Sequence, residues 1–245
     1  MTEVSRMLYA TTGSQNGAEG RVSATVGAIT RLIRSSELGP GDQLPSEANL
    51  SRDLNVSRTV IREAFRSLAA MHLIELSVGK RATVAELDYA ALSPLIEHGV
   101  HTEQISVQQV YDVRRTIEQR TAALAALRRS DDQGREILAH AEAMKANADT
   151  PEKIMEHDLG FHLAIAKAAR NPVFTLIVGA FEGVTRQTWP IGWRSRKNKA
   201  EQDFMLNLHG SIAEAIVAGD PQRAADLMAK HFDESVRALI VAGIS

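Results

Sequence analysis

Apolar residues recur at helical spacing in three segments near the N-terminus, and a short alternating stretch follows them. Residues 46–53 and 57–71 each begin with a serine, a residue type that caps helices, and Asn55 between them suits a tight turn. The stretch 75–87 alternates loosely around a Val-Gly-Lys turn and predicts a two-stranded hairpin. The first helix is expected over 21–36, with its apolar face formed by Val22, Val26, Ile29, Leu32 and Ile33.

The pattern becomes entirely helical after Ala85. Ser106 and Ser130 are each followed three residues later by glutamine, which predicts a capping box at the start of two helices. The first of these is expected to bury one stripe, formed by Val110, Val113, Ile117, Leu124 and Leu127. Further helices are expected over 150–171, 173–188, 200–218 and 221–240.

Proline marks two expected helix boundaries in this region. Ser93 before Pro94 predicts an N-cap with proline at the first helical position. The sequence Trp189-Pro190-Ile191-Gly192-Trp193 predicts a break, and the following RSRKNK stretch a loop. Trp189, Trp193 and Arg194 would then either cover a pocket or pack on the surface.

These elements predict a mainly α chain with two domains. The N-terminal domain, 21–85, is expected to be a winged helix-turn-helix, and 92–245 an all-helical bundle of six or seven helices. Residues 1–20 are rich in small polar residues and are expected to form a flexible arm. The joint 86–91 is short, so we expect the two domains to be coupled.

Composition and charge limit the compartment in which the chain is expected and the way in which it can contact nucleic acid. The chain of 245 residues is 44% hydrophobic and has no cysteine, which excludes disulfides and thiolate metal ligands and fits a cytoplasmic protein. It has no secretory signal and no apolar run of about 18 residues, so no membrane association is expected. Residues 1–85 carry a net charge of +2 and the remainder −4. Any contact with nucleic acid must therefore come from placed arginines rather than a broad basic field.

The third predicted helix carries two arginines that suit DNA recognition. Arg58 and Arg62 are one turn apart and share a face. A DNA major groove admits one α-helix, and an arginine can donate two hydrogen bonds to guanine. Ser46 and Ser57 cap helix N-termini that can hold phosphates. The alternative for the two arginines is a solvated helix face.

The segment from LPSE through LSRDLNVSRTVIREAFRSLAAMHLIEL to VGKRATV resembles the winged helix-turn-helix of the GntR family of bacterial transcription regulators. This resemblance implies DNA contacts by Arg58, Thr59, Arg62 and Gly79. Lys80 adds positive charge to the wing. Family members often carry arginine at the position of Ala48, so that contact is missing or replaced, and often glycine at the position of Arg81.

Three histidines and an aspartate have a pattern that suits a metal site. Asp158 and His162 are four residues apart and project from one helix face, while His209 and His231 lie on apolar faces of later helices. Three imidazoles and one carboxylate suit a divalent cation, with zinc expected and nickel, cobalt or manganese as alternatives. A single histidine in such a position is more often an ordinary core or surface residue than a metal ligand.

Residues 92–240 resemble the FCD ligand-binding domain of FadR-like regulators. The resemblance is carried by VYDVRRTIEQRTAALAA, DLGFHLAIAKAARNP, LHGSIAEAIVAGDPQRA and AKHF. It implies that Asp158, His162, His209 and His231 bind a metal beside a small carboxylate such as a sugar acid or hydroxy acid. Arg114 would capture the carboxylate or pair with Glu118, and Asn171 is a second candidate contact or simply a helix end.

The sequence therefore predicts a ligand-responsive transcription regulator and no enzyme. We expect a homodimeric repressor that binds a palindromic double-stranded DNA operator and is released by a carboxylate effector bound beside the metal. A pure metal sensor is an alternative from the same class. A metal-dependent hydrolase or lyase is an alternative from another, because such a site could activate water.

Overall fold

The computed structural model describes residues 17–244, which divide into two compact units with a boundary between Ala91 and Leu92. Each unit is described by itself. Most of the predicted arm, residues 1–16, lies outside the described residues. The last three residues of that arm are helical, because the first described helix begins at Ala18.

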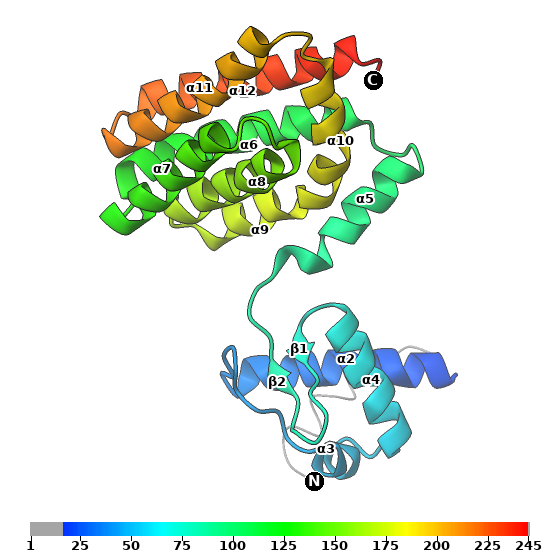
Figure 1. Cartoon of the computed structure of the whole chain (residues 1–245). Coiled ribbons are helices and arrows are strands. Elements are labelled where there is room, and N and C mark those ends of the chain that lie inside the picture. Colours follow the sequence, from blue (N-terminus) through cyan, green and yellow to red (C-terminus); the bar gives the residue numbers. More distant parts are fainter. Residues whose placement is uncertain (1–16, 245) are drawn as a thin grey trace. The chain divides into compact units, whose positions relative to one another are not determined.

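The described residues of the N-terminal unit form three helices and a small hairpin, whose arrangement is seen in Figure 1. Its helices are α2 (Ala18–Ser35), α3 (Glu47–Asp53) and α4 (Arg58–Ala70), followed by strands β1 (Ile74–Glu75) and β2 (Thr83–Val84). One apolar cluster joins these elements and includes the buried residues Ile29, Leu44, Leu50, Ile61, Phe65, Leu68 and Ile74. The predicted winged helix-turn-helix architecture thus has a core of its own.

Local sequence signals determine the turns of this unit. The Ser46 hydroxyl accepts from the Asn49 N–H at 3.2 Å, and that of Ser57 from the Val60 N–H at 3.3 Å, so both are N-caps. Asn55 has a φ of 52°, the left-handed conformation that asparagine tolerates. The strands pair antiparallel, with Ile74 opposite Val84.

The C-terminal unit is all helical (Figure 1). A 3-10 turn, η1 (Tyr89–Ala91), precedes it. The described residues of this unit form eight α-helices: α5 (Ser93–His101), α6 (Val107–Arg128), α7 (Asp131–Ala146), α8 (Pro151–Ala168), α9 (Pro172–Ala180), α10 (Glu182–Ser195), α11 (Lys199–Val217) and α12 (Pro221–Val241). Helix α6 packs against α12 and α8, while α7 packs against α8 and α11.

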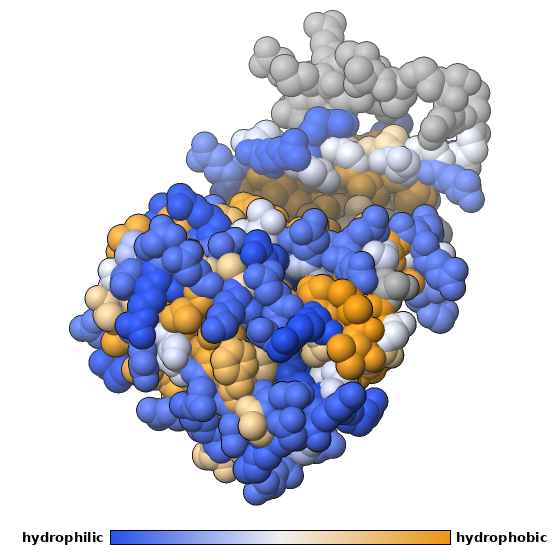
Figure 2. All heavy atoms as spheres, turned by 90° about the horizontal axis from the view of Figure 1, so that it is seen from above, coloured by the Kyte–Doolittle hydropathy of each residue, from blue (hydrophilic) through white to orange (hydrophobic). Residues whose placement is uncertain are grey.

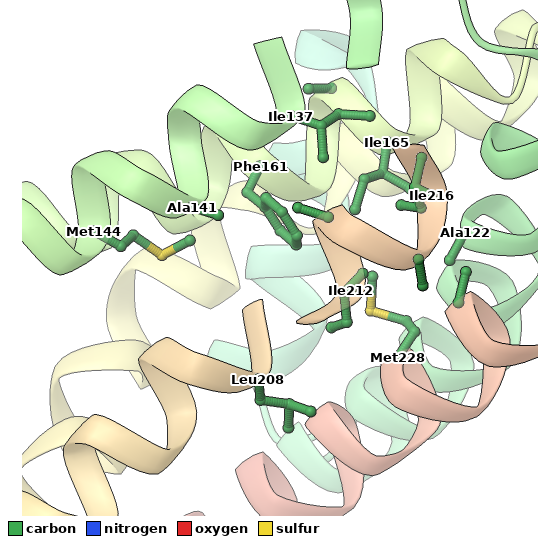
Figure 3. Packing of buried hydrophobic residues seen from close by; sticks show 14 of the residues in the cluster. Ala122, Ile137, Ala141, Met144, Phe161, Ile165, Leu208, Ile212, Ile216 and Met228 are labelled. Carbon is green, nitrogen blue, oxygen red and sulfur yellow. The ribbon is translucent and has the colours of Figure 1, made fainter. Parts of the chain in front are cut away.

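Side chains from α6, α7, α8, α10, α11 and α12 form the core of this unit, and part of this core is seen in Figure 3. Ile137 of α7, Phe161 and Ile165 of α8, Ile212 of α11 and Met228 of α12 are fully buried. The surrounding surface mixes hydrophilic residues with smaller hydrophobic patches (Figure 2). In the described part of the chain, no helix is long and apolar enough to cross a membrane.

The buried face of α6 differs from the predicted stripe. Both predicted capping boxes, at Ser106 and Ser130, are present. However, Val113 and Leu127 are 46% and 64% exposed. The interior side of α6 instead includes Arg114 and Glu118, which pair with each other. Apolar periodicity alone could not locate this face, because two of its buried side chains are charged.

The segment expected as one helix over 173–188 is two helices, α9 and α10, which meet at Phe181. The described part of the C-terminal unit therefore has more helices than the expected six or seven. The predicted break at Trp189–Trp193 was wrong, because α10 continues through Pro190. Trp189 and Trp193 stack with ring centroids 5.1 Å apart, and Trp193 is buried. Pro190 cannot donate a backbone hydrogen bond, yet the helix continues past it, and both tryptophans pack in or against the core.

Two smaller predictions also differ from the structure. The basic stretch RSRKNK begins inside α10 and ends at Lys199, the first residue of α11, so only 196–198 lie between helices. Ser93 does not cap α5. Leu92 occupies the N-cap position, and the Ser93 hydroxyl instead donates to Glu97 at 3.0 Å.

Candidate functional site

Four side chains predicted as metal ligands lie together inside the C-terminal unit. Asp158 and His162 come from α8, His209 from α11 and His231 from α12. All four residues are buried, and one ligand atom from each lies within 4.8 Å of the others. The helical period places the first two on one face of α8, and the packing of three helices brings the other two beside them.

Three buried nitrogen atoms in this cluster have no hydrogen-bond partner among the described residues: His162 Nε2, His209 Nε2 and His231 Nδ1. His209 Nδ1 lies 2.8 Å from the backbone oxygen of Met205, to which it can only donate. In the neutral His209 ring, Nε2 is then the nitrogen with the lone pair, and it lies 2.8 Å from Asp158 Oδ1. A carboxylate oxygen close to several ring nitrogens that lack partners fits a bound cation, and the donor set fits a divalent transition metal.

Electrostatics in the cluster favour the protonation states that bind metal. Burial alone would raise the pKa of Asp158, but His209 and His162 outweigh it and the pKa is lowered. Burial, with added repulsion from His209 and His162, holds the pKa of His231 well below its ordinary value. At neutral pH Asp158 is thus ionised and His231 is uncharged, as metal binding requires.

A buried ion pair adjoins the cluster. Arg114 Nε donates to Glu118 Oε1 at 2.8 Å, and its Nη1 donates to Thr185 Oγ1 at 2.8 Å. The other oxygen of Glu118 hydrogen-bonds His162 Nδ1. Burial would raise the pKa of Glu118, but Arg114 and His162 lower it, so the carboxylate is ionised. The sequence left open whether Arg114 pairs with Glu118, and it did not predict the contact with His162.

A cavity of about 40 Å³ lies between the four candidate metal ligands and Arg114. Its lining includes the four candidate ligands and Arg114, together with residues that sequence reasoning did not assign to a site: Tyr111, Thr185, Thr188 and Arg196. Burial lowers the pKa of Arg196, although nearby acidic groups oppose this shift. Only Arg196 lies in 189–198, the segment that was expected to lie outside the helical framework. Tyr111, Thr185 and Thr188 lie in expected helices, where no sequence signal marked them as site residues.

Asn171 is not among the described residues that line this cavity. Its side chain accepts from the Val173 N–H at 3.1 Å and caps α9. Arg194 is also absent from this lining, whereas Trp189 and Trp193 belong to it. The structure thus brings together Arg114 and the histidines but not Asn171.

Arg58, Thr59 and Arg62, which are predicted to contact DNA, have exposed side chains on the N-terminal unit. Arg58 and Thr59 occupy the first turn of α4, and Arg62 follows one turn later. Arg62 Nε lies 2.8 Å from Glu47 Oε2, yet the Arg62 side chain is 63% exposed. A surface ion pair of this kind contributes little stability and can open when the chain binds DNA.

At the tip of the wing, Gly79 has a φ of 73°, which favours glycine, and Lys80 is exposed.

The two units define a class: a DNA-binding winged helix-turn-helix joined to a helical ligand-binding domain. Residues 22–84 match the model of the bacterial regulatory proteins of the gntR family, and residues 109–234 match the FCD domain. The chain belongs to the GntR family, with an FCD domain as its C-terminal unit.

Known relatives agree with this assignment. The chain is 28% identical to the HTH-type transcriptional regulator LutR of Bacillus subtilis over 82% of its length and 92% of the relative. It is 30% identical to the galactonate operon transcriptional repressor of Escherichia coli, covering 80% of this chain and 85% of the relative. The solved structure of Streptococcus agalactiae GntR matches with a TM-score of 0.68 and 26% identity, covering 88% and 98% of the two chains.

The chain is therefore a ligand-responsive transcription regulator whose N-terminal unit binds DNA. The matched families and relatives are regulators rather than enzymes. The hydrolase or lyase alternative finds no support in them.

Proposed function

We propose that this chain is a cytoplasmic, homodimeric repressor that leaves a palindromic operator when a small carboxylate binds beside a divalent metal. The observation that carries this proposal is the unpartnered nitrogen cluster, with its buried aspartate, sharing one cavity with Arg114. A buried polar nitrogen without a partner costs on the order of 1–3 kcal/mol, so an ion that binds all three offsets a substantial penalty.

Asp158, His162, His209 and His231 would hold the metal, with zinc as the expected ion. A bound cation would offer open coordination positions to an oxygen ligand. The absence of cysteine in the chain also fits a nitrogen and oxygen donor set.

The effector would be a small carboxylate. Arg114 and Arg196 supply positive charge to the cavity, and Tyr111, Thr185 and Thr188 supply hydroxyl groups. A guanidinium recognises a carboxylate through paired hydrogen bonds, while hydroxyls suit a sugar acid or hydroxy acid. The relative named for the galactonate operon fits this class. A cavity of about 40 Å³ holds only a few water-sized groups, so a sugar acid requires side chains that line the cavity to move.

On DNA, α4 would enter the major groove. Arg58 and Arg62 would contact base edges, with Thr59 beside them, and the helix N-termini at Ser46 and Ser57 would contact phosphates. Gly79 and Lys80 would bring the wing to the backbone or minor groove. A symmetric dimer would place two such helices on half-sites about 34 Å apart.

Operator binding tests the proposal. The operator is first selected from random duplexes with the full chain, and affinity is then measured by fluorescence anisotropy with Zn²⁺ held constant. We expect one or more members of a panel of sugar acids and hydroxy acids to weaken binding at least about fivefold. Unchanged affinity across the panel, with a strong response to a chelator alone, would contradict the proposal and favour a metal sensor.

A further inference from the structure

Glu118 lies between a candidate metal ligand and the arginine of the cavity. One of its oxygens accepts from Arg114 Nε at 2.8 Å, and the other hydrogen-bonds His162 Nδ1. Its side chain is only 1% exposed, so neither bond competes with water. One carboxylate thus joins the metal cluster to the anion-binding part of the cavity.

The first consequence concerns His162. An ionised carboxylate only accepts hydrogen bonds, so His162 must donate from Nδ1. Its Nε2 is then the atom with the lone pair, and this is the nitrogen that lacks a partner. A carboxylate behind a metal-binding imidazole also raises the basicity of the coordinating nitrogen.

The second consequence concerns Arg114. Nε is held by Glu118 and Nη1 by Thr185, while the residue still lines the cavity. An incoming carboxylate at Arg114 would share this cation with Glu118. The negative charge of Glu118 would then be less neutralised by Arg114 and would act more strongly on His162.

We propose that Glu118 is a positioning residue that makes metal binding and carboxylate binding cooperative. Glu118 orients His162 for the metal. When a carboxylate binds Arg114, the negative charge of Glu118 acts more strongly on His162. Because coupling is reciprocal, the metal must strengthen carboxylate binding by the same factor that the carboxylate strengthens metal binding. This inference rests on the proposed function, since it concerns the same metal and effector.

The test compares the full chain with its Glu118→Gln variant, in which the side chain keeps its shape and loses its charge. Co²⁺ serves as the metal probe because its visible absorption reports the ligand set, and acetate and gluconate serve as carboxylate probes. The wild-type chain should bind Co²⁺ more tightly when either carboxylate is present. The variant should bind Co²⁺ about 10–100-fold more weakly, with an altered spectrum. The strengthening by carboxylate should shrink by about fivefold or more.

Asp112→Asn, which removes an exposed carboxylate from the same helix, is the matched control and should leave affinity, spectrum and coupling unchanged. If Glu118→Gln does not fold, as judged by circular dichroism, the double variant Arg114→Gln/Glu118→Gln removes both buried charges and should bind Co²⁺ without coupling. A folded Glu118→Gln chain with weaker Co²⁺ binding but unchanged coupling would reduce Glu118 to a packing role and overturn the proposal. A wild-type chain that binds no Co²⁺ would overturn the proposed function as well.

Discussion

Individual buried polar residues carry the chemistry of the C-terminal unit. Asp158 and the three histidines occupy positions where apolar side chains would pack without an unpartnered group. Arg114 and Glu118 are buried as well, and each depends on the other for charge neutralisation. Buried charges and polar atoms without partners destabilise the folded chain when no ligand is bound. We therefore interpret these residues as a site for a cation and an anion.

His209→Ala should abolish tight metal binding while leaving the secondary structure intact. The variant removes one of three imidazole donors and the group closest to Asp158. Metal content after dialysis against Zn²⁺, measured by mass spectrometry, should fall from one ion per chain to a small fraction. His157→Ala, which alters a histidine outside the cluster, is the control and should retain the ion. Full occupancy in the His209 variant would remove that residue from the ligand set.

Acidification should destabilise the metal-free chain, beginning below about pH 6.5. His231 has a lowered pKa in the folded chain, whereas the unfolded imidazole titrates near 6.5. Between these two pKa values the unfolded state binds a proton that the folded state does not. The free energy of unfolding therefore decreases as the pH is lowered through this range. Thermal unfolding in chelator at pH 7.5, 6.5 and 5.5 measures this effect. His231→Gln should flatten the slope, and an unchanged slope would contradict the assignment.

At the scale of elements, short caps and turns determine where the DNA-binding helices begin. Ser46 and Ser57 start α3 and α4, and Asn55 supplies the turn between them. These signals act within a few residues, and the sequence predicted them correctly. The continuation of α10 through Pro190 was missed, because the stacking of Trp189 on Trp193 and their packing on the bundle depend on distant residues.

Arg62→Ala in α4 should weaken operator binding by about 1–3 kcal/mol, roughly 5–150-fold, and relax the preference at one base pair. The loss should exceed that of a simple phosphate contact, since a bidentate contact to guanine distinguishes bases. Anisotropy titrations against the selected operator and its single-base variants measure both effects. Arg34→Ala, in the exposed last turn of α2, is the charge-matched control. Equal losses in the two variants would exclude Arg62 from base recognition.

At the scale of the whole molecule, the chain consists of two units, each with its own apolar cluster. The candidate metal and effector site lies wholly within the C-terminal unit, and the candidate DNA-binding residues lie wholly within the other. Any response of DNA binding to the ligand must therefore pass between the units or through a dimer contact. A coupling of about 1–3 kcal/mol is enough for such a response.

Metal should raise the unfolding temperature of the C-terminal unit selectively. An ion that binds only the folded unit at 100 times its dissociation constant adds about 2.7 kcal/mol to its stability. Scanning calorimetry of the full chain with Zn²⁺ and with chelator should show one transition that shifts and one that does not. A common shift of all transitions would indicate that the two units unfold together.

The sequence by itself determined the helical class, the two-domain division and the helix caps at Ser46, Ser57, Ser106 and Ser130. It also placed Asp158 and His162 on one helix face, since positions four residues apart share a face whatever the rest of the chain does. The resemblance to the FCD domain, rather than spacing, added His209 and His231 to this set. Only the tertiary structure decided which face of α6 is buried and which groups line the cavity. Glu118 joined His162 only when α6 and α8 packed together, a contact across 44 residues of chain. Such contacts depend on how helices pack, and no local pattern of polar and apolar residues encodes that packing.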